Sequence, residues 1–339
     1  MTAPALPDAL TRARALVNPA LRDAIETLDR HSRRLASYHL GWTDEHGQPA
    51  SASGGKAVRP TLALLSAEAA GADVRVGIPG AVAVELVHNF SLLHDDLMDG
   101  DVERRHRTTV WALYGAPAAI LVGDALLALA SQVLLESESR HGVAAARMLG
   151  RATQELIRGQ FDDIRFEQRR DVSVAACLRM AAGKTGALIG CSAAIGAVLA
   201  GASMTTVEAL STFGAELGLA FQLVDDLIGI WGDPSVSGKP AGSDLRTRKK
   251  SLPVTWAIAN GGAAGAELRS WMATPGPDTE SDIACASGLI ETTGARDWVE
   301  QEARRRLDIA ENAVISVPLE SNARDELLAL GRFVITREF

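Results

Sequence analysis

The 339-residue sequence contains few aromatic residues and few cysteines. Aromatic residues make up 4% of the chain, and the three cysteines, Cys177, Cys191 and Cys285, lie far apart in the sequence. Their odd number and their apolar or small-residue surroundings disfavour a disulfide framework or a zinc site. We therefore interpret them as reduced thiols of the core.

The sequence also lacks an excess of positive charge and a long apolar run. Lys and Arg number 34 against 42 Asp and Glu, a net charge of −8, which disfavours a nucleic-acid or anionic-membrane binder. No uninterrupted apolar run reaches about 18 residues, and no basic leader precedes an apolar stretch. We expect no nucleic-acid partner, no membrane span and a cytoplasmic location, so an anionic ligand would need local basic residues.

What the sequence does have is helical periodicity. Apolar residues recur at spacings of three and four, and strand-like alternation is scarce. This predicts an all-α protein of about ten or more helices in a single domain, 1–339, with 1–20 a candidate for a loosely ordered N-terminal extension. The predicted helices are Leu21–Leu40, Thr61–Ala70, Ala81–Asp99, Ala118–Glu136, Ala144–Arg169, Val174–Gly201, Thr206–Ile230, Leu252–Asn260 and Asp297–Ile315.

An acidic cluster followed by basic residues stands at 94–107, HDDLMDGDVERRHR. On a helix Asp95 and Asp99 lie about 40° apart, with Asp96 beside them. Carboxylates one turn apart repel each other, yet hard oxygen ligands at this spacing suit Mg²⁺ that also binds phosphate oxygens. Taken alone, the cluster is equally typical of a solvated helix end.

A second cluster of the same kind follows at 221–253. Asp225 and Asp226 end an apolar stretch, and Lys239, Lys249 and Lys250 come after them. Two acid-then-base clusters on two apolar helices favour a diphosphate site, with Mg²⁺ on one side of the diphosphate and Lys or Arg on the other.

Seven motifs occur in an order typical of one family: GGKAVRP, HNFSLLHDDLMD, RRHRTTVW, LVGDALLALA, GQFDDIRFE, AAGKTGALI and FQLVDD with GKPAGSDLRTRKKSLP. From about Gly54 to Pro253 the chain resembles trans-isoprenyl diphosphate synthases of the polyprenyl synthetase family. The resemblance implies an isoprenoid-synthase-type helical bundle around a central substrate cavity. It also implies a homodimer and a Mg²⁺-dependent, head-to-tail condensation of isopentenyl diphosphate with an allylic diphosphate.

The resemblance also implies residue roles. The resemblance implies about three Mg²⁺ ions per site. The implied ligands of these ions are Asp95, Asp96, Asp99, Asp225 and Asp226. The implied catalytic group is Asp95, Asp96, Asp99, Lys184, Asp225 and Lys239. The allylic diphosphate would contact Arg104, Lys184 and Lys239, with Thr185 and Gln222 nearby, and isopentenyl diphosphate would contact Lys56, Arg59, His88 and Arg105.

Three departures from the family pattern stand out. Gly229 replaces the usual third aspartate of the second motif, but Asp225 and Asp226 remain, so metal binding there is expected to survive in a weaker form. His106 and Thr108 replace the glycine and proline of the R-R-G-x-P-T element. The second lysine pattern of the family is shifted here, so Lys249 and Lys250 are both candidates for its lysine. We place Lys249 among the substrate-binding residues.

Product length is predicted from the residues before the first motif. Phe90 lies five positions before Asp95, and the motif lacks the two-residue insertion typical of bacterial farnesyl diphosphate synthases. This resembles short-chain synthases that make the twenty-carbon geranylgeranyl diphosphate. On a helix, however, Ser91 is about 40° and Phe90 about 140° from Asp95. Both residues are therefore candidates for the chain-length determinant.

Two other functions fit part of the sequence. A class I terpene cyclase shares the first aspartate motif, but Asp225, Gly229 and Asp233 lack the hydroxyl and the glutamate of its second metal motif. A cyclase also has no use for an isopentenyl diphosphate element such as GGKAVRP. A non-catalytic partner subunit of a prenyl synthase is the second alternative, although all three first-motif aspartates are present.

Overall fold

The computed structural model describes residues 8–50, 55, 57–169, 171–232, 242–274, 276 and 278–335. In these residues helices dominate, and the only strands form one short antiparallel hairpin, β1 (Glu103–Arg104) and β2 (Arg107–Thr108). The predicted all-α class is thus confirmed. The chain forms two compact units. Unit 1 comprises Met1–Thr153, Cys191–Ser211 and Val317–Leu327. Unit 2 comprises Gln154–Gly190, Thr212–Ser316 and Leu328–Phe339.

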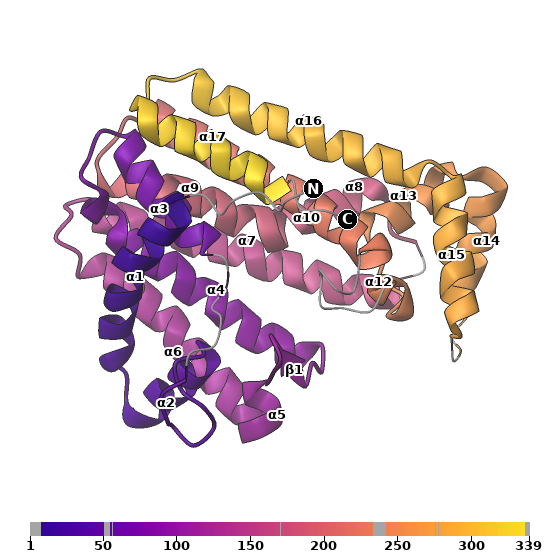
Figure 1. Ribbon diagram of the computed structural model, residues 1–339, viewed down its shortest axis with the longest axis horizontal. Helices are drawn as coiled ribbons and strands as arrows, with labels where there is room; N and C mark the ends of the chain where they lie inside the picture. Colours follow the sequence, from indigo (N-terminus) through magenta and orange to yellow (C-terminus); the bar gives the residue numbers. More distant parts are fainter. Residues whose placement is uncertain are drawn as a thin grey trace. The chain divides into compact units, whose positions relative to one another are not determined.

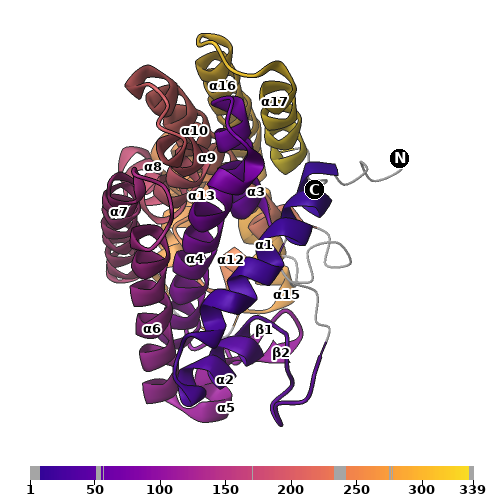
Figure 2. The ribbon, with the colours of Figure 1, turned by 90° about the vertical axis from the view of Figure 1, so that its left-hand side faces the viewer.

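Unit 1 is built around the apolar helix α4 (Ile78–Met98). Its other N-terminal elements are α1 (Asp8–Glu26), α2 (Arg30–His39), α3 (Val58–Ala69), η1 (Val74–Gly77), α5 (Val110–Tyr114) and α6 (Ala116–Leu135). Helix α4 packs between α3 and α6 (Figures 1 and 2). Because apolar neighbours cover most of its length, its last turns hold the first aspartate motif against a rigid support.

Unit 2 contains the second aspartate motif. The remaining elements of the chain are α7 (Gly142–Gln168), α8 (Val174–Ala181), the π-helical turn η2 (Ala182–Gly186), α9 (Ala187–Leu199), α10 (Met204–Trp231), α12 (Ser243–Arg246), α13 (Leu252–Asn260), α14 (Gly262–Ala273), α15 (Glu280–Thr292), α16 (Ala295–Ile315) and α17 (Ser321–Ile335). A core around Leu223, Leu227 and Leu252 supports the part of α10 that carries Asp225 and Asp226.

Two sequence predictions need correction. The predicted helix Leu21–Leu40 is wrong, because it breaks between α1 and α2, where the Asp29 side chain accepts hydrogen bonds from the backbone N–H groups of His31 and Ser32 and caps α2. Cys177 and Cys191 are buried as expected, but Cys285 is exposed. Of the predicted loose extension 1–20, residues 8–20 belong to helix α1, and residues 1–7 lie outside the described residues.

Among the described residues, three helical segments are long and apolar enough to cross a membrane by length and composition. They are Val74–Met98, Ala116–Leu135 and Val174–Leu199, of whose apolar windows 61%, 39% and 78% are buried. Most of the apolar window of the first and third segments is therefore buried in the protein core. Helix α6 is different, because much of its apolar surface is exposed.

Candidate active site

The three carboxylates of the first motif differ in exposure. Asp99 is exposed, Asp95 is partly buried, and Asp96 is only 2% exposed. The Asp96 Oδ1 atom accepts a hydrogen bond from Arg104 Nε at 2.5 Å. Burial raises the pKa of Asp96, although the positive charge of Arg104 opposes this shift. The Asp96 side chain is thus fixed by a charge-assisted pair.

This arrangement is compatible with Mg²⁺. In the part of the chain that the structure describes, no three or more His, Cys, Asp or Glu side chains form a ready-made metal cage. Mg²⁺ commonly binds one or two carboxylates and takes its other oxygens from phosphate and water. The Asp96 Oδ2 atom is buried and has no hydrogen-bond partner among the described residues, so it offers one such carboxylate oxygen.

The hairpin β1–β2 carries the three arginines of the RRHR segment, of which Arg104 and Arg105 are the predicted diphosphate contacts. Arg105 and His106 form its turn with φ of 53° and 61°, the left-handed region that favours glycine. The hairpin is anchored near α2: Arg107 donates to the carbonyls of Tyr38 (2.8 Å) and Thr43 (2.7 Å), and the Tyr38 hydroxyl donates to the carbonyl of Thr108 (2.7 Å). These bonds hold the two arginines in place.

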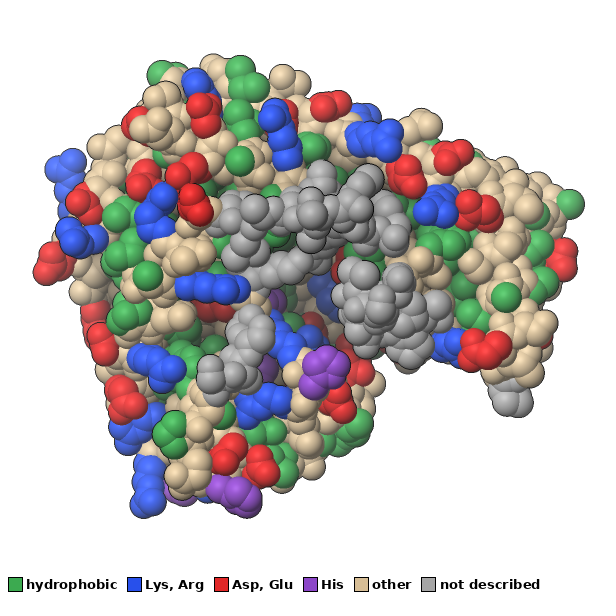
Figure 3. Space-filling view, in the orientation of Figure 1, with side chains coloured by type: hydrophobic (Ala, Val, Ile, Leu, Met, Phe, Trp, Pro, Cys, Tyr) green, Lys and Arg blue, Asp and Glu red, His purple; other side chains and the backbone are tan. Residues whose placement is uncertain are grey.

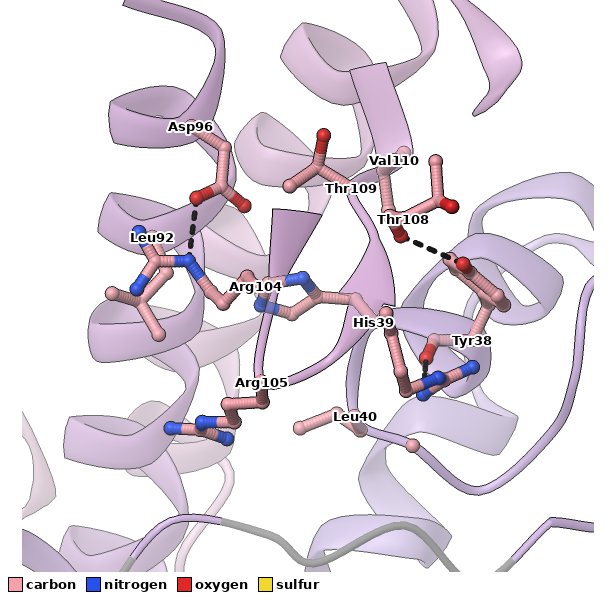
Figure 4. A pocket seen from close by; sticks show the side chains of 12 residues that line it. Tyr38, His39, Leu40, Leu92, Asp96, Arg104, Arg105, Thr108, Thr109 and Val110 are labelled. Atoms are coloured by element: carbon pink, nitrogen blue, oxygen red, sulfur yellow. Dashed lines mark hydrogen bonds and ion pairs between the residues drawn. The ribbon is translucent and has the colours of Figure 1, made fainter. Parts of the chain in front are cut away.

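A pocket in unit 1 lies between this hairpin, the end of α2 and α4. Asp96, Arg104, Arg105 and His39 line it. Figure 4 shows Arg104 pointing to Asp96 while Arg105 points away from it. In Figure 3, basic and histidine side chains gather around the place of the hairpin. A concave site rich in fixed guanidinium groups suits phosphate oxygens.

The residues predicted for isopentenyl diphosphate also gather in unit 1. Burial lowers the pKa of His88 well below its usual value, and the charges of Arg59 and Arg105 lower it further. His88 is therefore neutral near pH 7. The buried Arg59 Nε has no hydrogen-bond partner among the described residues, and such a donor suits an anion. Lys56 lies outside the described residues.

In unit 2 the residues of the second motif form a hydrogen-bonded chain. Thr185 Oγ1 donates to Gln222 Oε1 at 2.8 Å, and Gln222 Nε2 donates to Asp226 Oδ1 at 2.9 Å. Asp226 Oδ2 accepts from the backbone N–H of Leu252 at 2.9 Å. Burial raises the pKa of Asp226 to about 6. Because both Asp226 oxygens are engaged and Asp225 is exposed, Asp225 is the more accessible of the two predicted metal ligands.

Lys184 and Lys249 of unit 2 lie near carboxylates, whereas Lys250 Nζ donates to the backbone carbonyl of Glu167 at 3.1 Å. Lys184 Nζ lies 2.6 Å from Asp163 Oδ2, and Gly159 of α7 permits this closeness, because a Cβ there would lie 2.2 Å from the Lys184 backbone nitrogen. Burial lowers the pKa of Lys249, but Asp226 and Asp244 outweigh it, so that pKa is raised overall. Lys239 lies outside the described residues.

The sequence reading missed three residues of these groups: Asp163, Asp244 and His39. Asp244 is the most informative, because its carboxylate occupies the space beside Gly229. A Cβ at position 229 would lie 2.5 Å from Asp244 Cγ. The aspartate missing from the second motif is thus replaced locally by a carboxylate from α12. Asp244 ends the segment GKPAGSD of the sequence, but the closeness of Asp244 to Gly229 depends on how the chain folds back.

Comparisons with known proteins show which family the chain resembles. The sequence profile of the family described as "Polyprenyl synthetase" matches residues 41–289. The (2E,6E)-farnesyl diphosphate synthase of Mycobacterium tuberculosis is 52% identical over 100% of this chain and 95% of its own length. The geranylgeranyl diphosphate synthase of the same organism is 44% identical over 97% of this chain and 93% of its own length.

Solved structures show the same similarity. A polyprenyl synthetase from Streptomyces coelicolor A3(2), for which a crystal structure exists, has 51% sequence identity to this chain. The two structures match with a TM-score of 0.94 over 98% of this chain and 100% of that chain. A geranylgeranyl pyrophosphate synthetase from Pyrococcus horikoshii is 32% identical, with a TM-score of 0.87 over 98% and 99% of the two chains.

Proposed function

The chain belongs to the polyprenyl synthetase family and is a transferase of the polyprenyl diphosphate synthase class, and from this premise we propose its reaction. It condenses isopentenyl diphosphate with an allylic diphosphate, head to tail, and releases a short-chain prenyl diphosphate. The observation that carries the proposal is the pair formed by Asp96 and Arg104 beside the Arg59, His88 and Arg105 group.

The residues of unit 1 have two tasks in this proposal. Arg104 binds the allylic diphosphate, held in its orientation by Asp96. Arg59, Arg105 and the neutral His88 bind isopentenyl diphosphate, the two arginines supplying charge and the imidazole a hydrogen bond. Separate sets of donors for the two diphosphates explain why two adjacent arginines on one hairpin point in different directions.

The residues of unit 2 act on the leaving group. Lys184 and Lys249 are the proposed cations for the diphosphate that leaves as the allylic C–O bond breaks, and Asp225 is the proposed metal ligand. Mg²⁺ ions, about three per site in our proposal, would neutralise the departing diphosphate when bound. The isopentenyl double bond then attacks the allylic cation, and a proton lost to the released diphosphate leaves a chain longer by five carbons.

For product length we propose twenty carbons, with fifteen as the alternative. Phe90 is 6% exposed and packs edge-on against His94, with ring centroids 4.8 Å apart. An aromatic side chain fixed in this way can end a groove for a growing chain, and Ser91 lies one position further along α4. The alternative rests on the 52% identity to a farnesyl diphosphate synthase.

We also propose a cytoplasmic homodimer. Ile120, Leu121 and Leu135 of α6 are 43%, 66% and 57% exposed. Apolar side chains gathered on one helix usually mark an interface. A second copy of the chain is the proposed occupant, because docking there would cover the least buried of the three apolar segments.

The testing experiment supplies purified protein with Mg²⁺, isopentenyl diphosphate and, separately, allylic diphosphates of about five, ten and fifteen carbons, with products sized by mass spectrometry. Condensation supports the proposal, whereas hydrocarbon formation from an allylic substrate alone would favour a cyclase. No reaction in any mixture would favour a non-catalytic subunit. Phe90→Ala should lengthen the product, and an unchanged profile would remove Phe90 as the determinant.

A further inference from the structure

The residue before Lys249 has a backbone conformation that favours glycine. Arg248 has φ of 54°, in the left-handed region, where a residue with a Cβ atom is strained. It follows the short helix α12 and the residue that caps it, Thr247. A strained residue of this kind persists only where its surroundings compensate for the strain.

The left-handed residue belongs to a hydrogen-bonded turn that is common at helix C-termini. The Arg248 N–H donates to the carbonyl of Leu245 at 3.0 Å. The Lys249 N–H donates to the carbonyl of Asp244 at 2.8 Å. Helices that end in this way usually have glycine at the left-handed position. After the turn, Lys249 Nζ lies 3.9 Å from both Asp226 Oδ1 and Asp244 Oδ2, so the turn determines where Lys249 lies.

The side chain of Arg248 compensates for the strain through three contacts. Its Nη1 atom donates to the Trp271 carbonyl at 2.6 Å, and its Nη2 atom donates to Asp278 Oδ1 at 2.6 Å. Its guanidinium carbon lies 3.4 Å from the centroid of the Trp271 ring. The Arg248 and Asp278 side chains are only 19% and 15% exposed, so water screens this pair less than a surface pair. A planar guanidinium group that both donates and stacks is held in one orientation.

The residue after Lys249 is fixed as well. Lys250 Nζ donates to the carbonyl of Glu167 at 3.1 Å, and the Cys177 thiol donates to the carbonyl of Lys250 at 3.4 Å. Lys249 therefore lies between two neighbours that are both attached to other elements of unit 2. Of these two attachments, the one at Arg248 also maintains a strained turn.

We propose that the anchored side chain of Arg248 holds the left-handed turn that positions Lys249 for the leaving diphosphate. The inference rests on the proposed function of Lys249. Arg248 is a positioning residue, because Trp271 and Asp278 engage its guanidinium group and it acts on the diphosphate only through the backbone. Without the anchor, the strained residue leaves the left-handed region and Lys249 is displaced. Glycine needs no anchor there, because it adopts this region without strain.

The test compares alanine with glycine at position 248 of the full-length protein. Arg248→Ala and Arg248→Gly both remove the anchor and the charge, but only glycine adopts the left-handed turn without strain. Asp278→Ala weakens the anchor and leaves Arg248 in place. Glu280→Ala is the matched control, because Glu280 accepts from Arg246 at 2.5 Å, outside the anchor. The measurements are kcat, KM for each substrate, melting temperature and the Kd of inorganic diphosphate with Mg²⁺ by calorimetry.

For Arg248→Ala and Asp278→Ala we expect kcat/KM for the allylic diphosphate to fall about fivefold, and the Kd of inorganic diphosphate to rise about fivefold. Arg248→Gly and Glu280→Ala should stay within about twofold of the wild type, as should KM for isopentenyl diphosphate in every variant. Adding Arg248→Gly to Asp278→Ala should restore activity, because no strained side chain is left to hold. Adding Arg248→Ala to Lys249→Ala should cause no further loss, because Arg248 acts through Lys249.

Three results would overturn the proposal. One is equal activity of Arg248→Ala and Arg248→Gly, because the turn then needs no anchor or the charge of Arg248 acts directly. Another is a loss in Asp278→Ala that persists when Arg248→Gly is added. The third is an equal rise in KM for both substrates, the mark of general loosening.

The same measurements separate this proposal from the proposed reaction. If the wild-type protein condenses nothing, the proposed reaction is wrong, and the Kd of inorganic diphosphate in the alanine and glycine variants still decides the role of Arg248. A wild-type protein that binds no diphosphate overturns both.

Discussion

Restoring an aspartate at position 229 should harm this protein. In the family the second motif usually ends in aspartate, so Gly229→Asp looks like a repair. The structure predicts the opposite, because the new Cβ would lie 2.5 Å from Asp244 Cγ and Oδ2, against the ~3.5 Å of an ordinary contact. Asp244 would have to turn away from Lys249, whose Nζ lies 3.9 Å from Asp244 Oδ2.

The cost of Gly229→Asp can be estimated from these contacts. Loss of the partly exposed pair between Asp244 and Lys249 costs about 1 kcal/mol. Two carboxylates about 4 Å apart repel by up to ~4 kcal/mol at an effective dielectric constant of 20, part of which protonation relieves. The better helix propensity of aspartate over glycine returns a few tenths of a kcal/mol, roughly. We expect a net loss of about 2–4 kcal/mol.

The assay is urea unfolding followed by circular dichroism, without Mg²⁺, together with the Mg²⁺ dependence of condensation. Gly288→Ala is the control, because Gly288 lies within α15 of the same unit and a Cβ there meets nothing within 4 Å. It should stabilise by about 0.5–1 kcal/mol. A Gly229→Asp protein with wild-type stability and tighter Mg²⁺ binding would refute the idea that Asp244 fills this position.

Three further predictions follow from other parts of the structure. His106→Gly should raise the free energy of unfolding by about 1 kcal/mol, because His106 sits at φ 61°; a decrease in urea stability would mean that its exposed pair with Glu103 outweighs that strain. Burial, with the charges of Arg104 and Arg105, lowers the pKa of His39 to about 3. Between about pH 6.5 and 3 the folded state therefore binds fewer protons than the unfolded state. The free energy of unfolding then falls with pH by up to about 1.4 kcal/mol per pH unit. His39→Gln should flatten that acid limb in unfolding curves taken at several pH values, and an unchanged slope would mean that His39 does not contribute to it. Leu121→Asp, on the exposed apolar side of α6, should shift a dimer to monomer in sedimentation analysis, whereas Met204→Asp at the exposed start of α10 should not; equal behaviour of the two would point to another interface.

Much of the candidate site follows from local sequence patterns. Spacings of three and four residues predicted α4, α6, α7 and α10 within a few residues of their observed ends, because burial of one helix face imposes that period. The first aspartate motif fell on the last turns of α4 for the same reason. The order of the motifs then indicated a diphosphate site, since the residues that bind phosphate and metal within each motif are close in sequence.

Other features depend on contacts between residues far apart in the chain, which no local pattern encodes. The pairing of Lys184 with Asp163 and the placement of Asp244 beside Gly229 are examples. The break at Asp29 is different, because this local capping residue overrides an otherwise continuous apolar period. The sequence by itself determined which elements form and which chemistry they carry; the tertiary structure alone decided which carboxylate faces which cation, because that depends on how the chain folds back on itself.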